Sequence, residues 1–174
     1  MPELMSIEKK GFFATPPGAL RDICRILRPP HRKSPVRLLE PCAGEGVAAA
    51  TVRTGLIGDN PNQRVEVFAC ELDQVRATRA AEHLGNRFTN VVCAGFEQMH
   101  ITAQAFNLCY LNPPYQEEFA DPKERQEFTF LKRAFPKLQP GAVLVYVVKR
   151  EFLDNYEIRD WIANRFEYIS IWRF

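Results

Sequence analysis

The residues best suited to chemistry stand together in the tetrapeptide Asn112-Pro113-Pro114-Tyr115. Two consecutive prolines cannot continue a strand, and Pro113 holds Asn112 in an extended conformation, so the tetrapeptide predicts a stiff turn. The amide oxygen of Asn112 and the carbonyl oxygen of Pro113 can each accept one hydrogen of an amino group, while the Tyr115 ring stacks on a flat molecule. The turn therefore predicts a site for a planar amine. An ordinary Asn-Pro loop followed by a surface tyrosine is the alternative.

An apolar run over residues 106–111 leads into this turn and predicts a buried parallel strand. The tetrapeptide then lies at the carboxyl end of a strand, which is where open α/β sheets bind their ligands. The element that positions the turn is thus expected to be an inner strand of a sheet.

A glycine-rich turn follows the first predicted strand, residues 36–40. Gly44 and Gly46 connect this strand to an alanine-rich helical segment, and such a unit lets the backbone approach a nucleotide-like ligand. Glu40 and Glu45 flank the turn, so they would repel a pyrophosphate and attract a ligand that carries an ammonium and a sulfonium. S-adenosylmethionine (SAM) is such a ligand and lacks phosphate. The spacing of the two glycines also fits the dinucleotide-binding fingerprint, which leaves a nicotinamide cofactor as an alternative.

Two further residues follow predicted strands at the same edge of the sheet. Glu71 ends the strand predicted over residues 64–71, where its carboxylate can accept both hydroxyls of a ribose. The alternative is that Glu71 only caps the helix predicted over residues 73–84. Phe96 follows a short strand at residues 90–93 and can lie against an adenine ring or belong to the core, and the sequence leaves both readings open.

The rest of the chain continues the alternation of strands and helices, which predicts a doubly wound, mostly parallel α/β sheet. Further strands are expected at residues 142–148 and 168–172, and further helices at residues 15–28, 124–138 and 152–165. Thr15 is placed to cap the first of these helices. Gln139-Pro140-Gly141 is expected to end the helix at residues 124–138.

The composition fits one globular domain with a sizeable core: the chain has 174 residues, of which 46% are hydrophobic and 25% charged. The net charge of +2 neither requires nor excludes a nucleic-acid partner. Five cysteines without close pairing are expected to be reduced packing residues, and the three scattered histidines suggest no metal site. No apolar run reaches membrane-spanning length and the start lacks a signal-peptide core, so we expect a cytoplasmic protein. We expect a flexible N-terminus over residues 1–10 and a single domain over residues 11–174.

Four motifs in this order resemble the class I SAM-dependent methyltransferases. They are Phe13-x-Thr15-Pro16, Glu40-Pro41-x-x-Gly44-x-Gly46, Glu71 and Asn112-Pro113-Pro114-Tyr115. Specifically, the chain is similar to the amino-methyltransferases that carry an Asn-Pro-Pro-Tyr motif, most of which methylate the exocyclic amino group of adenine in DNA. The resemblance covers nearly the whole chain. It implies a Rossmann-like methyltransferase fold, SAM as the cofactor, and a nucleic-acid partner, with DNA favoured over RNA.

The resemblance also implies roles for individual residues. Thr15 and Pro16 would touch the methionine end of SAM. The residues that would line the loop around the cofactor are Glu40, Cys42, Gly44 and Gly46. Glu71 would hold the ribose and Phe96 would flank the adenine ring. The Asn112-Pro113-Pro114-Tyr115 turn would carry the catalytic residues.

Three departures from the family pattern keep other functions open. Gly95 and Asn107 stand where the family usually has acids. A seventh strand paired with the sixth and a target-recognition region are not evident, so the sheet is expected to lack its last strand. Either the chain is part of a longer protein or a partner completes it.

Three alternatives to a base methyltransferase remain. One is a protein methyltransferase that acts on a glutamine side-chain amide, which is also planar. Another is a module that binds SAM or nucleic acid without catalysis. A nicotinamide-dependent oxidoreductase fits least well, because Glu71 follows Gly44 by 27 positions instead of the usual 20 or so.

Overall fold

The computed structural model describes residues 13–29, 34–60, 62–85, 88–115 and 125–173, and the residues predicted as a flexible N-terminus lie outside these ranges. Five strands form one sheet in the order β3-β2-β1-β4-β5, and every neighbouring pair is parallel. The strands are β1 (Val36–Glu40), β2 (Val65–Glu71), β3 (Thr89–Cys93), β4 (Phe106–Leu111) and β5 (Leu138–Tyr146). This confirms the predicted doubly wound, mostly parallel sheet.

The strand order reverses between β1 and β4. From β1 the chain moves outward through β2 to β3, and it then returns to β4 on the other side of β1. Leu38 pairs with Leu108, and Leu39 with Cys109, so the two strands run side by side toward their carboxyl ends. Loops that leave adjacent strands in opposite directions open a crevice between them. The glycine-rich turn after β1 and the Asn112 turn after β4 follow these two neighbouring strands at the same edge of the sheet.

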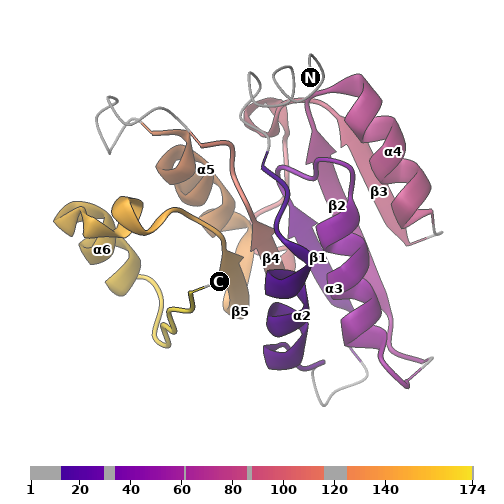
Figure 1. Ribbon diagram of the computed structural model, residues 1–174, viewed down its shortest axis with the longest axis horizontal. Coiled ribbons are helices and arrows are strands. Elements are labelled where there is room, and N and C mark those ends of the chain that lie inside the picture. Colours follow the sequence, from indigo (N-terminus) through magenta and orange to yellow (C-terminus); the bar gives the residue numbers. More distant parts are fainter. Residues whose placement is uncertain (1–12, 30–33, 61, 86–87, 116–124, 174) are drawn as a thin grey trace.

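Helices cover both faces of the sheet (Figure 1). The elements on one face are α2 (Pro17–Ile26), α3 (Val47–Ile57) and α4 (Gln74–Leu84). Those on the other are α5 (Gln126–Ala134), the short 3₁₀ helices η2 (Phe135–Lys137) and η3 (Arg150–Asp154), and α6 (Tyr156–Ala163). A further 3₁₀ helix, η1 (Phe96–Gln98), follows β3. None of the helices in the described ranges is both long and apolar enough to cross a membrane.

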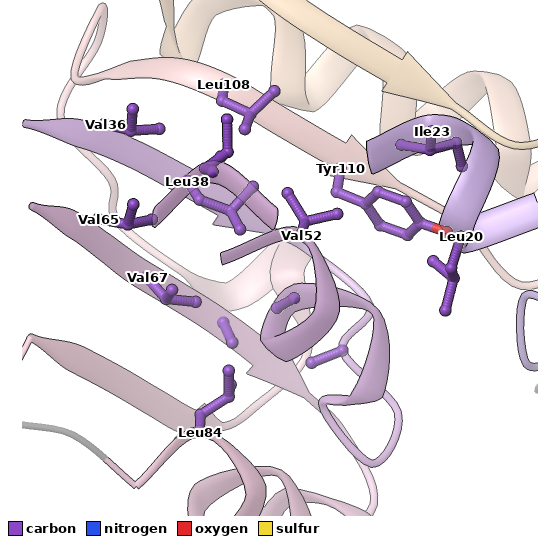
Figure 2. Close-up of a cluster of buried hydrophobic side chains, with 14 residues drawn as sticks. Leu20, Ile23, Val36, Leu38, Val52, Val65, Val67, Leu84, Leu108 and Tyr110 are labelled. Atoms are coloured by element: carbon purple, nitrogen blue, oxygen red, sulfur yellow. The ribbon is translucent and has the colours of Figure 1, made fainter. Parts of the chain in front are cut away.

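Two apolar cores lie on the two faces of the sheet, and β4 contributes to both. Leu108 and Tyr110 belong to the core beneath α2 and α3, whereas Cys109 and Leu111 belong to the core beneath α5 and α6. Figure 2 shows the Tyr110 ring reaching from β4 toward Leu20 and Ile23 of α2. Since side chains alternate along a strand, Asn112 continues on the side of Tyr110. The strand therefore aims Asn112 at the N-terminal end of α2.

The second half of the chain differs from the prediction in three places. The helix predicted to run to Leu138 ends as α5 at Ala134, and β5 begins at Leu138 and passes through the predicted stop signal. This is possible because Gly141 adopts a φ of 77° where the pairing of β4 with β5 shifts register. The predicted helix over residues 152–165 is divided into η3 and α6.

The strand predicted over residues 168–172 is wrong. These residues form no strand, and four of them are apolar but at least half exposed: Tyr168, Ile169, Ile171 and Trp172. Within the described residues β5 pairs only with β4. A strand needs a neighbour to satisfy its backbone groups, and alternation of apolar residues does not supply one.

Candidate active site

The side-chain amide of Asn112 is held by the N-terminal segment of the chain. Its Nδ2 atom donates to the carbonyl oxygen of Phe13 at 2.8 Å and to Oγ1 of Thr15 at 3.1 Å. Its Oδ1 atom accepts a hydrogen bond from the hydroxyl of Tyr115 at 2.9 Å. A carbonyl oxygen has two lone pairs, so Oδ1 retains capacity for one more donor. The Oδ1 atom of Asn112 can therefore accept one further hydrogen bond.

The Tyr115 ring packs against the Phe13 ring, and its hydroxyl is hydrogen-bonded to Asn112. Its ring centroid is 5.4 Å from that of Phe13, and Lys149 Nζ lies 5.9 Å from the ring centre. Burial raises the pKa of Tyr115 to about 12, and the nearby Glu127 carboxylate adds to the shift. The phenol therefore stays protonated at neutral pH and donates to Asn112. To stack on a flat substrate, the ring would have to share or exchange its contact with Phe13.

The two prolines complete the turn. Pro113 is buried and Pro114 is half-buried. Within the described residues no backbone donor reaches the carbonyl oxygen of Pro113.

The glycine-rich turn has the backbone shape that its glycines predict. Gly44 and Gly46 have φ values of 55° and 78°, in the region that disfavours other residues. A Cβ atom on Gly46 would lie 2.9 Å from Cα of Ala80 in α4. The second glycine is therefore required for the close packing of α4 on the turn, in addition to its backbone angle.

Glu71 anchors the turn to β2. Its Oε2 accepts from the backbone N–H of Gly44 at 2.8 Å, and its Oε1 accepts from the backbone N–H of Asp73 at 2.9 Å. Arg76 donates to the same Oε1 from Nη2 at 2.8 Å and from Nε at 3.1 Å. Asp73, rather than Glu71, caps α4. Because Oε1 is fully used, a ribose hydroxyl could be accepted only by the remaining lone pair of Oε2.

Glu40 is a buried carboxylate beside the same turn. It is 2% exposed, and its Oε2 atom has no hydrogen-bond partner among the residues that the structure describes. Burial raises its pKa well above the usual value; the backbone N–H of Ala49 lowers it and Glu71 raises it further. An unpartnered buried oxygen here is the kind of group that the ammonium of a bound ligand would satisfy.

Glu45 does not share this role. It forms an ion pair with Arg79 of α4, and its carbonyl oxygen lies 2.6 Å from Nδ1 of His83. The expectation that Glu40 and Glu45 together attract a cationic ligand is therefore wrong for Glu45, because α4 supplies a positive partner for it. Of these two carboxylates, Glu40 is the one that we assign to the ammonium of the ligand.

An exposed apolar surface next to Glu71 was missed in the sequence. Leu72 is 70% exposed and Val75 is 62% exposed, directly after the end of β2. A flat ring could lie on these side chains while its ribose reaches Glu71. The exposure of Leu72 could have been predicted from the sequence, because an apolar residue that follows an acid at the end of a strand lies beyond the core.

Phe96 lies in the core. It is 2% exposed, and its ring stacks on Phe130 with 5.9 Å between centroids. The sequence left open whether Phe96 lies against an adenine ring or belongs to the core, and in the structure its side chain packs in the core. Gly95 precedes it as the residue before η1. Leu72, in contrast, is 70% exposed beside Glu71.

Thr15 and Pro16 lie at the start of α2, but Thr15 does not cap the helix. Pro16 is the N-cap residue and is exposed, and no side chain caps this helix end. The hydroxyl of Thr15 instead lies 2.6 Å from that of Tyr110 and accepts from Asn112. The predicted cap is therefore wrong, because two partners nearly a hundred positions away compete successfully for the hydroxyl.

Cys42 follows β1 and is half-buried. Burial raises the pKa of its thiol well above the usual value, and Glu40 and Glu71 raise it further. A thiol in these surroundings stays protonated, so Cys42 can line the site but is not a nucleophile. All five cysteines are free. The described residues contain no group of side chains that could hold a metal ion.

Asn107 has a structural task at the other end of β4. Its Oδ1 accepts from the backbone N–H of Arg37 at 2.8 Å, and its Nδ2 donates to the carbonyl of Pro35 at 3.1 Å. Both bonds join β4 to the start of β1, at the edge opposite the site. A carboxylate could not make the second bond, so an amide at this position reflects strand pairing.

Glu127, in the first turn of α5, was also missed. It is 2% exposed, and its Oε2 atom has no hydrogen-bond partner within the described part of the chain. Burial raises the pKa values of Tyr115 and Tyr146, and the charge of Glu127 adds to both shifts. The hydroxyl of Tyr146 donates to the Glu127 carbonyl at 2.8 Å. Sequence could not indicate this burial, because a glutamate in a first helical turn is usually exposed.

Comparisons with known proteins identify the family and the fold. A family model described as an uncharacterised methyltransferase family (DUF6094) matches residues 1–174. No protein of curated function is significantly similar in sequence.

Solved structures with a similar fold include several methyltransferases. A protein from Listeria monocytogenes assigned as a class I SAM-dependent methyltransferase is 13% identical and gives a TM-score of 0.71 over 88% of this chain and 53% of its own. The tRNA (m1A58) methyltransferase TrmI from Aquifex aeolicus is 13% identical, with a TM-score of 0.59 over 89% and 55%. A protein from Pyrococcus horikoshii assigned as an RNA methyltransferase is 17% identical, with a TM-score of 0.60 over 86% and 69%. The chain thus spans little more than half the length of the first two.

Proposed function

The chain belongs to the methyltransferase family DUF6094 and has the class I methyltransferase fold, and from this we propose that it transfers a methyl group from SAM to the exocyclic amino group of a nucleic-acid base. The observation that supports the proposal is that Asn112 and Pro113 follow β4, the strand that lies next to β1 and its glycine-rich turn; there Asn112 Oδ1 and the Pro113 carbonyl would act as the two amine acceptors. Adenine in DNA is the favoured target, from the resemblance carried by the Asn-Pro-Pro-Tyr motif.

The residues around the glycine-rich turn fit SAM. Glu40 would accept the ammonium of the methionine part, and Gly44 and Gly46 would let the backbone approach it. Oε2 of Glu71 would accept one ribose hydroxyl, and Leu72 would support the adenine ring. Cys42 and Pro16 would line the methionine end. When bound, SAM supplies a methyl group on a cationic sulfur that is ready to leave as a neutral thioether.

Asn112 and Pro113 would activate the acceptor nitrogen. An aromatic amine is a poor nucleophile because its lone pair is delocalised into the ring. Two acceptors that hold its hydrogens favour tetrahedral geometry at nitrogen and free the lone pair. The new N–C bond would form as the S–C bond breaks, and the nitrogen, then positively charged and acidic, would lose its proton to water. Because the proton leaves only after transfer, no strong base is needed, and positioning supplies most of the remaining acceleration.

Basic side chains near the site favour a nucleic-acid substrate. Lys149 and Arg150 are exposed just beyond β5, and Lys149 lies over the Tyr115 ring. Two of the proteins with a similar fold are described as acting on RNA. A base in a duplex would have to be flipped out of the stack to reach Asn112. Target recognition would come from a partner or from sequence outside this domain, residues 11–174.

The experiment that tests the proposal is transfer from radiolabelled SAM to a mixture of DNA, RNA and peptides. Digestion of the nucleic acids to nucleosides then identifies the methylated base. We expect label in N6-methyladenine from DNA, and none with Asn112→Ala. Label on a glutamine amide of a peptide would support the protein methyltransferase instead. SAM binding with no transfer to any of the three would indicate a non-catalytic binding module.

A further inference from the structure

Resting on the proposed function, we propose that Thr15 and Tyr110 are positioning residues that fix the side-chain amide of Asn112 with its oxygen toward the substrate. The three residues form a continuous chain of hydrogen bonds from the core to the reactive turn. Tyr110 and Thr15 act through Asn112 and need not touch the substrate.

The partners of Asn112 determine which way its amide faces. The Phe13 carbonyl can only accept a hydrogen bond, so the group 2.8 Å from it must be Nδ2. The second hydrogen of Nδ2 points to Oγ1 of Thr15 at 3.1 Å. Both donors are then used on the side of α2, and Oδ1 faces Tyr115. A rotated amide would place two oxygens against each other and leave Nδ2 facing the substrate amine.

Tyr110 makes this arrangement rigid. Its side chain is 1% exposed and packs in the core with Leu20 and Ile23 of α2 (Figure 2). Its hydroxyl lies 2.6 Å from Oγ1 of Thr15. Burial raises the pKa of this phenol, so it remains protonated at neutral pH. The core therefore holds Thr15, and Thr15 orients one donor of Asn112.

The orientation of the Asn112 amide matters because the site must accept hydrogen bonds from the substrate amine and not donate them to it. With Oδ1 toward the substrate, one lone pair takes the Tyr115 hydroxyl and the other can take an amine hydrogen. With Nδ2 toward the substrate, donors would face donors and the amine lone pair would not be freed. Loss of orientation should therefore lower kcat, while SAM binding at the glycine-rich turn is unaffected.

Kinetics with Thr15→Val, Thr15→Ser and Tyr110→Phe separate positioning from simple structural support. Valine keeps the shape of threonine and removes its hydroxyl, and serine restores the hydroxyl. On the nucleic acid that accepts label, we expect Thr15→Val to lower kcat about tenfold, the effect of losing one hydrogen bond in the transition state. Since the family resemblance also places Thr15 beside the methionine end of SAM, SAM affinity is measured in parallel by calorimetry, and Tyr110→Phe, which acts only through Thr15, should leave it within about twofold. Tyr110→Phe should give a smaller loss of kcat, and Thr15→Ser should recover most of the wild-type rate.

Two control variants make the same atomic changes at exposed positions. Thr54→Val removes a hydroxyl that bonds only within α3, and Tyr156→Phe removes a hydroxyl from a residue that is 71% exposed. Both should keep the wild-type kcat. Wild-type kcat in Thr15→Val would overturn the proposal, as would equal losses in Thr15→Val and Thr15→Ser.

A second readout needs no substrate. The side-chain NH₂ signals of Asn112, assigned with Asn112→Asp, report both of its donors by NMR. We expect slow hydrogen exchange in the wild-type protein and faster exchange in Thr15→Val. Unprotected NH₂ hydrogens in the wild-type protein would overturn the positioning role even if methyl transfer is found. If no nucleic acid or peptide is methylated, protected signals would still support the positioning role while the proposed function fails.

Discussion

Glu40→Gln should make the protein more stable and a poorer binder of SAM. Glu40 is 2% exposed and its Oε2 atom has no partner. Burial raises its pKa well above the usual value, which means that the ionised form is unfavourable in the folded protein. Glutamine has the same shape without the charge, so it removes this cost. It also removes the charge that we assign to the ammonium of SAM.

The magnitude follows from the burial. A buried polar group without a partner costs about 1–3 kcal/mol, and more when charged, and glutamine retains part of this cost through its own amide. The net gain should be about 1–2 kcal/mol at pH 8, within the range of stabilising substitutions at functional sites. For a chain of 174 residues this raises Tm by about 2–8 °C. Loss of a charge-assisted bond of about 1.5–3 kcal/mol should weaken SAM binding by about 10- to 150-fold.

The pH dependence gives the sign of the effect. The folded-state pKa of Glu40 is raised, so protonation of Glu40 favours the folded state. Its contribution to stability is fully present below the ordinary glutamate pKa of 4.5 and is lost as the pH rises through the folded-state pKa. The difference between Glu40→Gln and wild type should therefore vanish below pH 4.5 and grow toward pH 8.

Thermal unfolding followed by circular dichroism from pH 4 to pH 9, together with calorimetric SAM titration at pH 8, measures both effects. Glu66→Gln is the control, since Glu66 is 28% exposed and pairs with Arg37 and Arg64 at the surface. A Tm difference that does not change with pH would refute the desolvation argument. A stabilised variant that binds SAM as tightly as wild type would remove Glu40 from the cofactor site.

Three further substitutions test other parts of the site. Glu71→Ala should lower the free energy of unfolding by about 3–5 kcal/mol, because it removes a buried ion pair with Arg76 and the acceptor for the backbone N–H of Gly44. It should also weaken SAM binding in calorimetry, and a loss of stability under about 1 kcal/mol, as for a surface pair, would contradict this. Gly46→Ala should destabilise by at least about 2 kcal/mol in urea unfolding, since backbone strain adds to the contact with α4. Gly141→Ala is the control, because Gly141 has a φ of 77° but an open Cβ position. It should therefore lose only the free energy due to backbone strain. Equal losses of unfolding free energy in the two variants would exclude a contribution from packing against α4. Asn107→Asp should cost about 1–3 kcal/mol of stability, because an oxygen would face the Pro35 carbonyl, and should leave kcat unchanged; a raised kcat would show that an acid there serves catalysis.

The elements that the sequence predicted well are those determined by local pattern. Apolar runs located β1, β2 and β4, and the glycines of the first turn have the φ values expected of them. The Asn112 turn lies at the carboxyl end of β4 because two prolines cannot extend a strand. In each case the residues themselves restrict the backbone, so no information about distant partners was needed.

The elements that the sequence predicted poorly depend on distant partners. Thr15 has the type and position of a helix cap, but Tyr110 and Asn112 hold its hydroxyl. Residues 168–172 have the alternation of a strand and no neighbour among the described residues. From the sequence, Leu138 could equally be the last residue on the apolar face of a helix or the first residue of β5.

Charged residues show the same limit. Glu45 and Glu40 both flank the glycine-rich turn in sequence. In the structure, Glu45 forms an ion pair with Arg79 of α4, whereas Glu40 is buried. The burial of Glu127 depends on how α5 packs near Tyr115 and Tyr146. Such assignments require the arrangement of helices on the sheet, which local sequence does not determine.

The central claim is that Asn112 holds an amine of a nucleic-acid base next to the methyl group of SAM. Transfer of labelled methyl groups to DNA, read out as modified nucleosides for the wild-type protein and Asn112→Ala in parallel, tests this most directly. We expect N6-methyladenine with the wild-type protein and none with Asn112→Ala, although both proteins should bind SAM equally well. Equal turnover by the two proteins would contradict it.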